Sequence, residues 1–242
     1  MELLEKDFLY EGKAKRVFKG EHENSVIIYY KDSATAFNNV KKGTIVNKGI
    51  VNCKITSILY SYLKENGIKN HLIETLNERI HHCDKLEIIP LEVIVRNKIA
   101  GSASKLLGLE EGYSINSPII EICYKSDSLN DPLINDFHGI ALGIVTRNEL
   151  DYIYEETLKI NNLLKEFFTK CNLELIDFKI EFGKNNSGEI ILGDEISPDT
   201  CRLWDLSTGD KMDKDRFRRD LGNVEETYLE VLRRVELVGE KC

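Results

Sequence analysis

The sequence predicts an α+β fold, in which strands and helices are grouped along the chain and do not alternate. Short strand-like segments separated by glycines fill residues 9–37, long amphipathic helical patterns occupy the middle and the end of the chain, and a charged hairpin lies between those two helical patterns. Strands that do not alternate one for one with helices favour α+β over a doubly wound parallel sheet.

Composition narrows the class of protein. The chain has 242 residues, which suggests one large domain or two small domains sharing a cleft. Its 42% hydrophobic and 31% charged residues are typical of a globular protein with a buried core and exclude a disordered, collagen-like or disulfide-scaffold protein. No apolar run approaches the ~20 residues of a membrane span, so we expect no membrane partner. Residues 1–7 lack a basic segment followed by an apolar one, so we expect no signal peptide.

Charge and cysteine content suggest the partners and the compartment. With 33 basic and 41 acidic residues the net charge is −8, which argues against a polynucleotide partner, although a cleft can be basic inside an acidic protein. The six cysteines form no Cys-x-x-Cys pair, so we expect reduced thiols in a cytoplasmic protein and no zinc site. Neighbouring His81 and His82 would point to opposite faces of a strand, which disfavours metal binding there.

The first elements are short strands followed by a helix. The strands are predicted at Leu9–Tyr10, Lys15–Phe18 and Val26–Tyr30. Gly12 and Gly20 separate them as turn residues would. Apolar residues at mostly helical spacing predict a helix over Thr44–Asn66, and Gly67 is placed to cap its C-terminus.

Residues 72–95 again have a strand-like pattern. Pro90 would interrupt a central strand and suits an edge or a crossing between sheets. We place a hinge at residues 85–90, which divides the chain into domains 1–86 and 87–242.

Two helices are predicted in the second half of the chain. Thr146 and Glu149 form a capping box at the start of a helix over Arg147–Lys170, whose single apolar stripe packs in the core or forms a docking face. A last helix is predicted over Lys214–Val238, with seven residues facing inward: Phe217, Leu221, Val224, Tyr228, Val231, Leu232 and Val235.

A charged hairpin precedes the last helix. Apolar and charged residues alternate over Leu175–Phe182, Gly183–Gly188 has the composition of a turn, and Glu189–Ile196 continues as a second strand. If those six turn residues form the loop, Asp177 lies opposite Asp194 on the partner strand.

Glu181 would share the sheet face of Asp177 and Asp194, with Lys179 beside them. Gathered carboxylates repel one another unless a cation neutralises them, and Mg²⁺ prefers such oxygen ligands, usually completed by phosphate. The alternative is an ordinary solvated strand face.

Three further segments carry polar side chains suited to binding anions. Gly193–Asp205 packs charged residues around a proline and the only tryptophan, and its Arg202 has the shape for a two-pronged contact to phosphate or carboxylate. Tyr10–Val17 places a glycine and three cations in a hairpin that either covers a polyphosphate or is solvated. Pro90–Ser102 is a buried-looking strand ending in Arg96, followed by a small-residue turn where Ser102 can hold an anion.

A fourth segment, residues 124–132, holds a polar cluster without a decisive signature. Its charged residues are Lys125, Asp127 and Asp131.

Taken together, six segments resemble the bacterial SAICAR synthetase family of purine biosynthesis. The segments are Tyr10–Lys15, Lys31–Asn38, Pro90–Ser102, Asp177–Gly183, Gly193–Asp205 and Lys211–Arg218. The resemblance covers nearly the full chain, and Gly-Asp-Glu-x-Ser-Pro-Asp-x-x-Arg-x-Trp is its most specific part. It implies an ATP-dependent ligase that joins L-aspartate to carboxyaminoimidazole ribonucleotide (CAIR), giving SAICAR, ADP and phosphate through an acyl phosphate.

The resemblance also implies the architecture. A small antiparallel N-terminal sheet with a glycine-rich loop would lie over ATP, and a larger α+β domain would carry the metal and substrate residues, as in kinase-like and ATP-grasp-like folds. It further implies Mg²⁺ as a cofactor and a homodimer.

Roles follow from the resemblance by position. Gly12, Lys13, Ala14 and Lys15 would cover the phosphates of ATP. Lys85, Leu86 and Ile88 would line the adenine, and Lys125 would approach the nucleotide. Glu181 and Asp194 would ligate Mg²⁺. Arg96, Ser102, Asp177 and Arg202 would bind CAIR, and the catalytic set would be Lys13, Lys179, Asp199 and Arg202.

Two other functions compete with the ligase. A nucleotide-binding regulatory module of the same fold would have no need to keep Lys13, Glu181, Asp194 and Arg202 together. A kinase would need the His-Arg-Asp and Asp-Phe-Gly motifs, which are missing from the sequence. No residues are assigned to L-aspartate at this stage.

Overall fold

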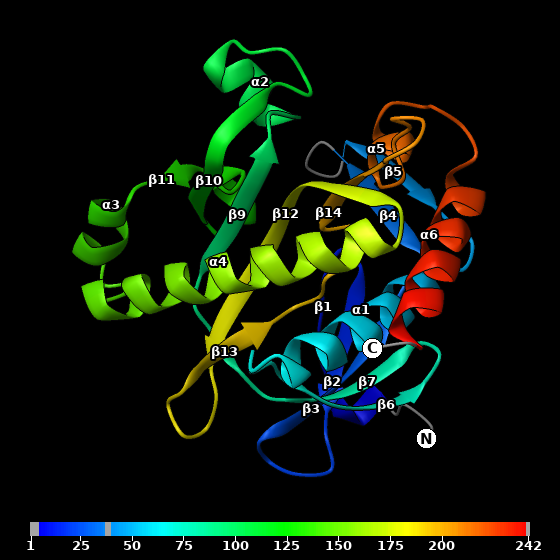
Figure 1. The fold of residues 1–242 in the computed structure, drawn as a ribbon. Helices are drawn as coiled ribbons and strands as arrows, with labels where there is room; N and C mark the ends of the chain where they lie inside the picture. The colour runs from blue at the N-terminus through cyan, green and yellow to red at the C-terminus, as the bar shows by residue number, and fades with distance from the viewer. Residues whose placement is uncertain (1–4, 37–39, 241–242) are drawn as a thin grey trace.

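Helices and antiparallel sheets are combined in an α+β architecture, as the sequence predicts (Figure 1). The computed structural model describes residues 5–36 and 40–240. Phe37 and Asn38 of the Lys31–Asn38 segment, the N-terminal residues 1–4 and Cys242 lie outside the described residues.

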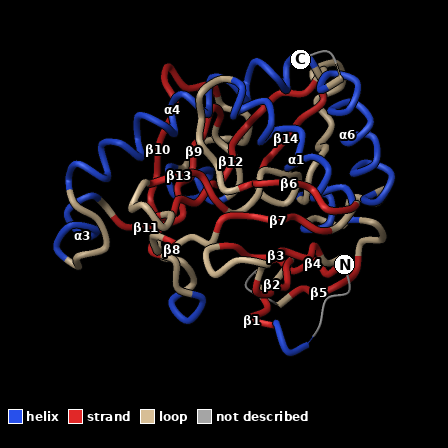
Figure 2. The backbone as a smooth tube through the Cα atoms, turned by 90° about the horizontal axis from the view of Figure 1, so that it is seen from below, coloured by secondary structure: helices blue, strands red, loops and turns tan. Residues whose placement is uncertain are grey.

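A five-stranded antiparallel sheet contains the N-terminal strands and two strands that follow the first helix. Its order is β1-β2-β3-β7-β6, and these strands lie in succession in Figure 2. Their bounds are β1 Phe8–Glu11, β2 Lys15–Lys19, β3 Ser25–Tyr30, β6 Leu72–Asn77 and β7 Ile80–Asp84. A separate two-stranded ribbon consists of β4 Ser33–Ala36 and β5 Lys41–Thr44.

A seven-stranded sheet carries the second half of the site. Strand β12 is at its centre, because it pairs with β9, β13, β14 and β8. The bounds are β8 Glu87–Ile88, β9 Leu91–Lys98, β10 Ser114–Tyr124, β11 Leu133–Ile134, β12 Leu173–Lys184, β13 Ile190–Gly193 and β14 Cys201–Asp205. Pro90 separates β8 from β9, as expected of a proline that cannot donate to a ladder.

The helices cover this sheet and one another. Helix α4 crosses a face of the large sheet, and α1 packs against both α6 and β3 (Figure 1). Their bounds are α1 Lys48–Glu65, α2 Ser102–Leu107, α3 Asp136–Ala141, α4 Arg147–Lys170, α5 Asp215–Arg218 and α6 Val224–Gly239, with short 3₁₀ turns at Glu5–Asp7 and Asp127–Leu129. Within the described part of the chain, none of these helices combines the length and apolarity needed to cross a membrane.

The apolar stripe of α4 lies in the core. Ile153, Ile160 and Leu164 are fully buried, and they join a continuous hydrophobic cluster with side chains from β9, β12 and α6. Core packing is therefore the role of this stripe, and the alternative of a docking face is wrong.

The first helix begins later than its apolar spacing predicts. Residues 41–44 form β5, which pairs with β4 from Ser33↔Thr44 to Ala36↔Lys41, and the helix begins at Lys48. Asn47 precedes it with a left-handed φ of 63°. Thr44, the first residue of the predicted helix, pairs with Ser33 instead, and residues 45–47 precede the helix, whereas Gly67 does follow the helix end with φ +85°.

The predicted C-terminal helix is two helices. Residues 219–223 interrupt it with three left-handed positions: Asp220, Gly222 and Asn223. Leu221, predicted to face the core, is therefore 45% exposed. The apolar spacing continues across the break, so it does not reveal the interruption.

The predicted register of the charged hairpin is wrong. Strand β12 extends to Lys184, which pairs with Ile190, and Glu181 pairs with Gly193. The Asn185 side chain accepts hydrogen bonds from the amides of Ser187 and Glu189, which holds the chain reversal at residues 185–189 and not at 183–188. As a result, Asp177 lies opposite Arg96 of β9 and Arg202 of β14 instead of opposite Asp194.

The capping box of α4 provides a test of local stability. The Thr146 hydroxyl accepts from the Glu149 amide at 3.2 Å, and the Glu149 carboxylate accepts from the Thr146 amide at 2.7 Å. We expect Thr146→Ala to lower the free energy of unfolding by about 1 kcal/mol, because the Glu149 amide at the helix start loses its side-chain acceptor. Urea denaturation measures this loss. Thr146→Ser retains a hydroxyl and serves as the control, and equal stability of Thr146→Ala and wild type would contradict the assignment.

Candidate active site

A cavity of about 730 Å³ lies between the small sheet and the large sheet. Its wall takes residues from β1, β2 and β3 on one side and from β9, β12 and the 194–202 segment on the other. Each candidate residue proposed from the sequence lies on this wall: Gly12, Lys13, Ala14, Lys15, Lys85, Leu86, Ile88, Arg96, Ser102, Lys125, Asp177, Lys179, Glu181, Asp194, Asp199 and Arg202. The fold therefore gathers the whole predicted set, and their individual roles remain predictions.

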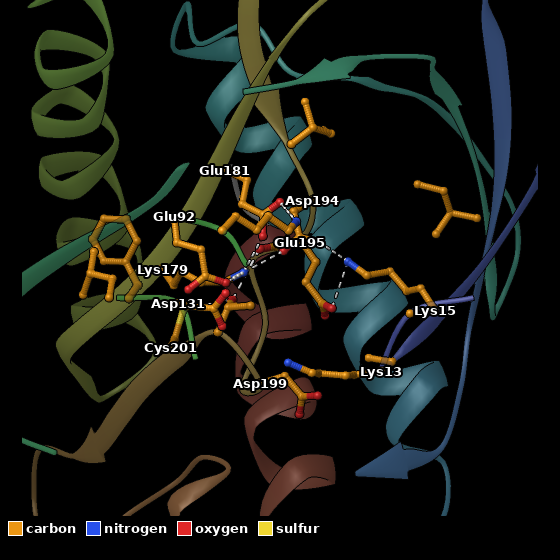
Figure 3. Close-up of a pocket in the computed structure, with 18 of the residues that line it drawn as sticks. Lys13, Lys15, Glu92, Asp131, Lys179, Glu181, Asp194, Glu195, Asp199 and Cys201 are labelled. Atoms are coloured by element: carbon orange, nitrogen blue, oxygen red, sulfur yellow. Dashed lines mark hydrogen bonds and ion pairs between the residues drawn. The ribbon is translucent and has the colours of Figure 1, made fainter. Parts of the chain in front are cut away.

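The basic hairpin between β1 and β2 forms one rim of the cavity. The Gly12 amide donates to the Lys15 carbonyl at 2.9 Å, which makes the turn tight. Lys13 reaches across to Asp127 at 2.7 Å and is 40% exposed. Lys15 points inward to Asp194 and Glu195 (Figure 3). Although burial lowers the pKa of Lys15, these two carboxylates outweigh it and raise that pKa, so the ammonium is retained.

An apolar slot lies at the end of the cavity formed by residues 84–88. Leu86 packs against two glycines of the large sheet, Gly183 of β12 and Gly193 of β13. A Cβ on Gly183 would lie 2.8 Å from the Leu86 Cβ, and one on Gly193 would lie 3.0 Å from its Cδ1. These glycines let Leu86 approach the sheet, and Val17, Val26 and Ile28 complete the apolar surroundings. A flat apolar ring fits such a slot.

Lys179 occupies the centre of the cavity floor. Its ammonium lies 2.7 Å from Glu181, 3.2 Å from Glu92 and 3.3 Å from Asp194, as Figure 3 shows. Lys125 forms a second ion pair with Glu181. Burial lowers the pKa of Lys179, but the three carboxylates raise it well above its ordinary value. For Asp194 the effects are reversed: burial raises its pKa, but the charges of Lys15 and Lys179 lower it by more, so the net pKa is below its ordinary value. Both groups are therefore charged at neutral pH.

Glu181 and Asp194 can serve together as metal ligands. They approach each other from neighbouring strands because both contact Lys179. Within residues 5–36 and 40–240, no group of three or more His, Cys, Asp or Glu side chains forms a site able to hold a metal ion. Two carboxylates alone suit Mg²⁺ when phosphate oxygens and water complete its shell, so the donor set fits this ion only together with a polyphosphate.

Two arginines flank a buried carboxylate at the other end of the cavity. Asp177 accepts from Arg96 at 3.1 Å and from Arg202 at 2.8 Å. Arg96 also donates to the Ser102 hydroxyl at 3.0 Å. Gly101 has φ +56°, and a Cβ there would lie 2.4 Å from an Arg202 nitrogen, so glycine leaves room for the guanidinium. Burial raises the pKa of Asp177, and the two arginines oppose that rise.

Asp199 is buried in a cluster that the sequence patterns did not reveal. It accepts from Lys48 at 2.8 Å, from Tyr228 at 2.8 Å and from Lys214 at 3.3 Å. These partners come from α1, α6 and the residue before α5, so no local spacing connects them. Burial raises the pKa of Asp199, but Lys214 and Lys48 lower it further, so the group is a carboxylate.

Other residues of the wall were also missed by sequence reasoning. They include Glu92, Glu195, Lys214 and Arg218. Lys214 and Arg218 belong to the Lys211–Arg218 segment that supports the family resemblance, which was the one available signal for them.

His71 lies on the same wall and is buried. Its Nε2 lies 3.2 Å from the carbonyl oxygen of Asp194. Burial, followed by the charge of Lys15, lowers the pKa of His71 to about 4. The ring is therefore neutral in the folded protein at pH 7.

Comparisons with known proteins place this site among related structures. The SAICAR synthetase family model matches residues 8–235. The chain is 60% identical over 232 residues to the phosphoribosylaminoimidazole-succinocarboxamide synthase of Clostridium novyi (strain NT), covering 96% of this chain and 98% of that protein.

Solved structures agree with the sequence comparison. The crystal structure of the synthase of the same name from Ehrlichia chaffeensis superposes with a TM-score of 0.93 at 46% identity, covering 95% of this chain and 98% of that one. A type-2 SAICAR synthetase in complex with ADP superposes with a TM-score of 0.91 at 45% identity, covering 93% and 96% of the two chains.

The buried ring of His71 makes stability depend on pH. An unfolded histidine titrates near 6.5 and this one near 4, so between these values the unfolded state binds more protons. The free energy of unfolding should fall as the pH is lowered from 6.5 to 4.5, by at most about 1.4 kcal/mol per pH unit from this group. Above pH 6.5 its contribution is complete. We expect His71→Asn to reduce the pH dependence measured by urea denaturation, and His22→Asn, at an exposed residue, to leave it unchanged. An identical slope in His71→Asn and wild type would refute this.

Proposed function

The chain belongs to the SAICAR synthetase family, and on that premise we propose how its cavity binds ATP, Mg²⁺ and CAIR and joins L-aspartate to CAIR. The chain is a ligase of purine biosynthesis that uses ATP, and not a regulatory module without turnover. The observation that carries the detailed proposal is the convergence of the basic hairpin, the Lys179 cluster and the Arg96–Asp177–Arg202 cluster on one cavity.

ATP would span the apolar slot and the floor of the cavity. The adenine would lie against Leu86 and Ile88 beside Lys85, and the phosphates would extend below Gly12, Ala14 and Lys15, as under the glycine-rich loops of kinase-like and ATP-grasp-like folds. The slot, the tight Gly12 turn and the inward Lys15 support this placement. Lys13 and Lys125 are partly exposed and each pairs with a carboxylate, Asp127 and Glu181 respectively, which each lysine would exchange for a phosphate oxygen. In this arrangement domain 1–86 covers the nucleotide and domain 87–242 supplies the other residues.

Glu181 and Asp194 would hold Mg²⁺ together with phosphate oxygens. When bound, Mg²⁺ neutralises charge on the transferred phosphoryl group. Lys179 would then exchange a carboxylate partner for an oxygen of the γ-phosphate or of the CAIR carboxylate. The raised pKa of Lys179 supports this role, because the ammonium stays charged throughout.

CAIR would lie at the arginine end of the cavity. Arg96, Ser102 and Arg202 would bind its phosphate, since guanidinium groups match phosphate oxygens in pairs. Asp177 orients both guanidiniums and would accept a hydrogen bond from a ribose hydroxyl. With its phosphate at the arginines and its ribose at Asp177, CAIR would direct its imidazole carboxylate toward Lys179 and the γ-phosphate.

The chemistry then needs positioning more than acid–base catalysis. A carboxylate oxygen of CAIR attacks the γ-phosphorus and ADP leaves with the electrons of the broken bond, giving an acyl phosphate. The ammonium group of L-aspartate gives up one proton to water, the resulting amine nitrogen attacks the acyl carbon, phosphate leaves, and the nitrogen loses a second proton. Lys179, Lys13 and Arg202 would stabilise the charges in place, and Asp199 would accept a hydrogen bond from the entering ammonium.

The compartment and assembly are also proposals. The cysteines at positions 53, 83, 123, 171 and 201 are buried thiols, which suits a reducing cytoplasm. A homodimer is proposed from the family resemblance alone.

An assay of ADP release tests the ligase proposal directly. Release should require both CAIR and L-aspartate, so omitting either one should abolish it. ADP release that needs neither substrate would reject the ligase.

The metal role of Asp194 has its own test. Asp194→Asn keeps the shape of the side chain but removes the charge that attracts Mg²⁺, so we expect Mg²⁺-dependent ADP release to fall by about a hundredfold or more while the circular dichroism spectrum is unchanged. Asp151→Asn, at an exposed carboxylate of α4, is the control and should keep full activity. Full activity in Asp194→Asn would show that the metal is held elsewhere.

Arg202 separates ribonucleotide binding from ATP binding. Arg202→Ala removes two charge-assisted hydrogen bonds, and we expect the KM for CAIR to rise about tenfold or more while the KM for ATP stays within twofold. Arg202→Lys should recover part of the loss. Arg233→Ala, which removes an exposed arginine paired with Glu230, should change neither constant. An unchanged KM for CAIR in Arg202→Ala would exclude the contact.

A further inference from the structure

Two basic side chains on the cavity wall have no role in the function proposed above: Lys214 and Arg218. We propose that they form the subsite for the amino-acid substrate and bind the two carboxylates of L-aspartate. This inference rests on the proposed function and assigns a subsite that the reaction requires.

Lys214 and Arg218 lie one helical turn apart. The Arg218 amide donates to the Lys214 carbonyl at 3.0 Å, which is the i to i+4 bond of a helix. Side chains four residues apart project from the same helix face, so both cations are presented to the cavity side by side. A ligand with two carboxylates separated by two carbons matches such a pair better than a single phosphate does.

The carboxylates that contact Lys214 and Arg218 are also paired with other cations. Asp199 is already compensated by Lys48, which is only 1% exposed and lies 2.8 Å away, whereas Lys214 is at 3.3 Å. Asp215 receives two guanidiniums, Arg202 at 3.0 Å and Arg218 at 2.5 Å. Asp199 therefore has one cation more than its single charge requires. Asp215 shares Arg202 with Asp177, but Arg219 approaches it as a third cation at 3.6 Å. Burial lowers the pKa of Lys214 despite Asp199, so a carboxylate of the ligand would stabilise its ammonium form.

The β4–β5 ribbon closes the subsite from the opposite side. Lys41 of β5 donates to the Phe217 carbonyl and to Asp220, both at 2.6 Å. A Cβ on Gly43 would lie 3.0 Å from the Phe217 ring, so the ribbon packs tightly on α5, and Figure 1 shows β5 beside that helix. The small side chains of Thr35 and Ala36 face the cavity from β4.

The subsite also lies beside the groups that act on CAIR. Arg202 and Arg218 both form ion pairs with Asp215, and Lys214 forms an ion pair with Asp199. An amino acid held by Lys214 and Arg218 therefore lies beside the arginine end of the cavity, where Asp199 can accept a hydrogen bond from its ammonium group. The ribonucleotide phosphate keeps its own pair of cations, Arg96 and Arg202.

Separate KM measurements for the three substrates test this subsite. We expect Lys214→Gln and Arg218→Gln each to raise the KM for L-aspartate about tenfold or more, with the KM for CAIR and for ATP within twofold of wild type. Succinate, a dicarboxylate without the amine, should inhibit wild type competitively with L-aspartate. Its inhibition constant should rise in each variant by a factor similar to the rise in KM. Arg218→Lys should recover part of the loss.

Arg219→Gln is the matched control. Arg219 is the next residue and binds Glu111 at 2.8 Å, so we expect all three KM values to stay near wild type. A rise in the KM for CAIR with an unchanged KM for L-aspartate would overturn the proposal and assign the two cations to the ribonucleotide. Unchanged values for all three substrates, or equal rises for all three, would overturn it as well. If wild type releases ADP without either substrate, the proposed function itself fails, which is a distinct result.

Discussion

The alternation of side chains along β12 is the constraint on which the site depends. Helix α4 packs on one face of this strand, so that face must be apolar, and Phe178, Ile180 and Phe182 supply it. Successive residues point to opposite faces, so Asp177, Lys179 and Glu181 are all directed into the cavity. The core and the chemistry are therefore two faces of one strand.

Buried charge governs the cavity as a consequence. A charged group taken out of water is costly unless it is paired, and lone charges in such a place change their protonation state. Lys179 contacts three carboxylates at the centre of the cavity floor, two of which also pair with Lys15 and Lys125, while Asp177 holds two arginines at one end. Both clusters keep a fixed set of charges, which is what a reaction between anionic substrates needs. An anionic substrate then exchanges partners with groups that are already ordered.

Elements were predicted correctly from the sequence where residues close together in the chain stabilise them. The helix at Arg147–Lys170 begins and ends as predicted, because the Thr146–Glu149 capping box is contained within four residues. The two-residue periodicity of β12 and the turn at Gly12 are local in the same sense. The predicted helices were wrong at one start and at one break. Thr44 pairs with Ser33 of β4 and so does not begin α1, and the interruption at residues 219–223 is a backbone feature that the apolar spacing does not show.

The sequence by itself determined the α+β class, the family and most of the charged residues that line the cavity, because these are carried by short motifs and strand periodicity. Only the tertiary structure decided which charges meet. A shift of three residues in the hairpin moved Asp177 from Asp194 to the two arginines, and a change of register alters every cross-strand pair at once. The partners of Asp199 come from three separate segments, so only packing reveals them. The same packing placed Lys214 and Arg218 on the wall, where their charge is available to a ligand.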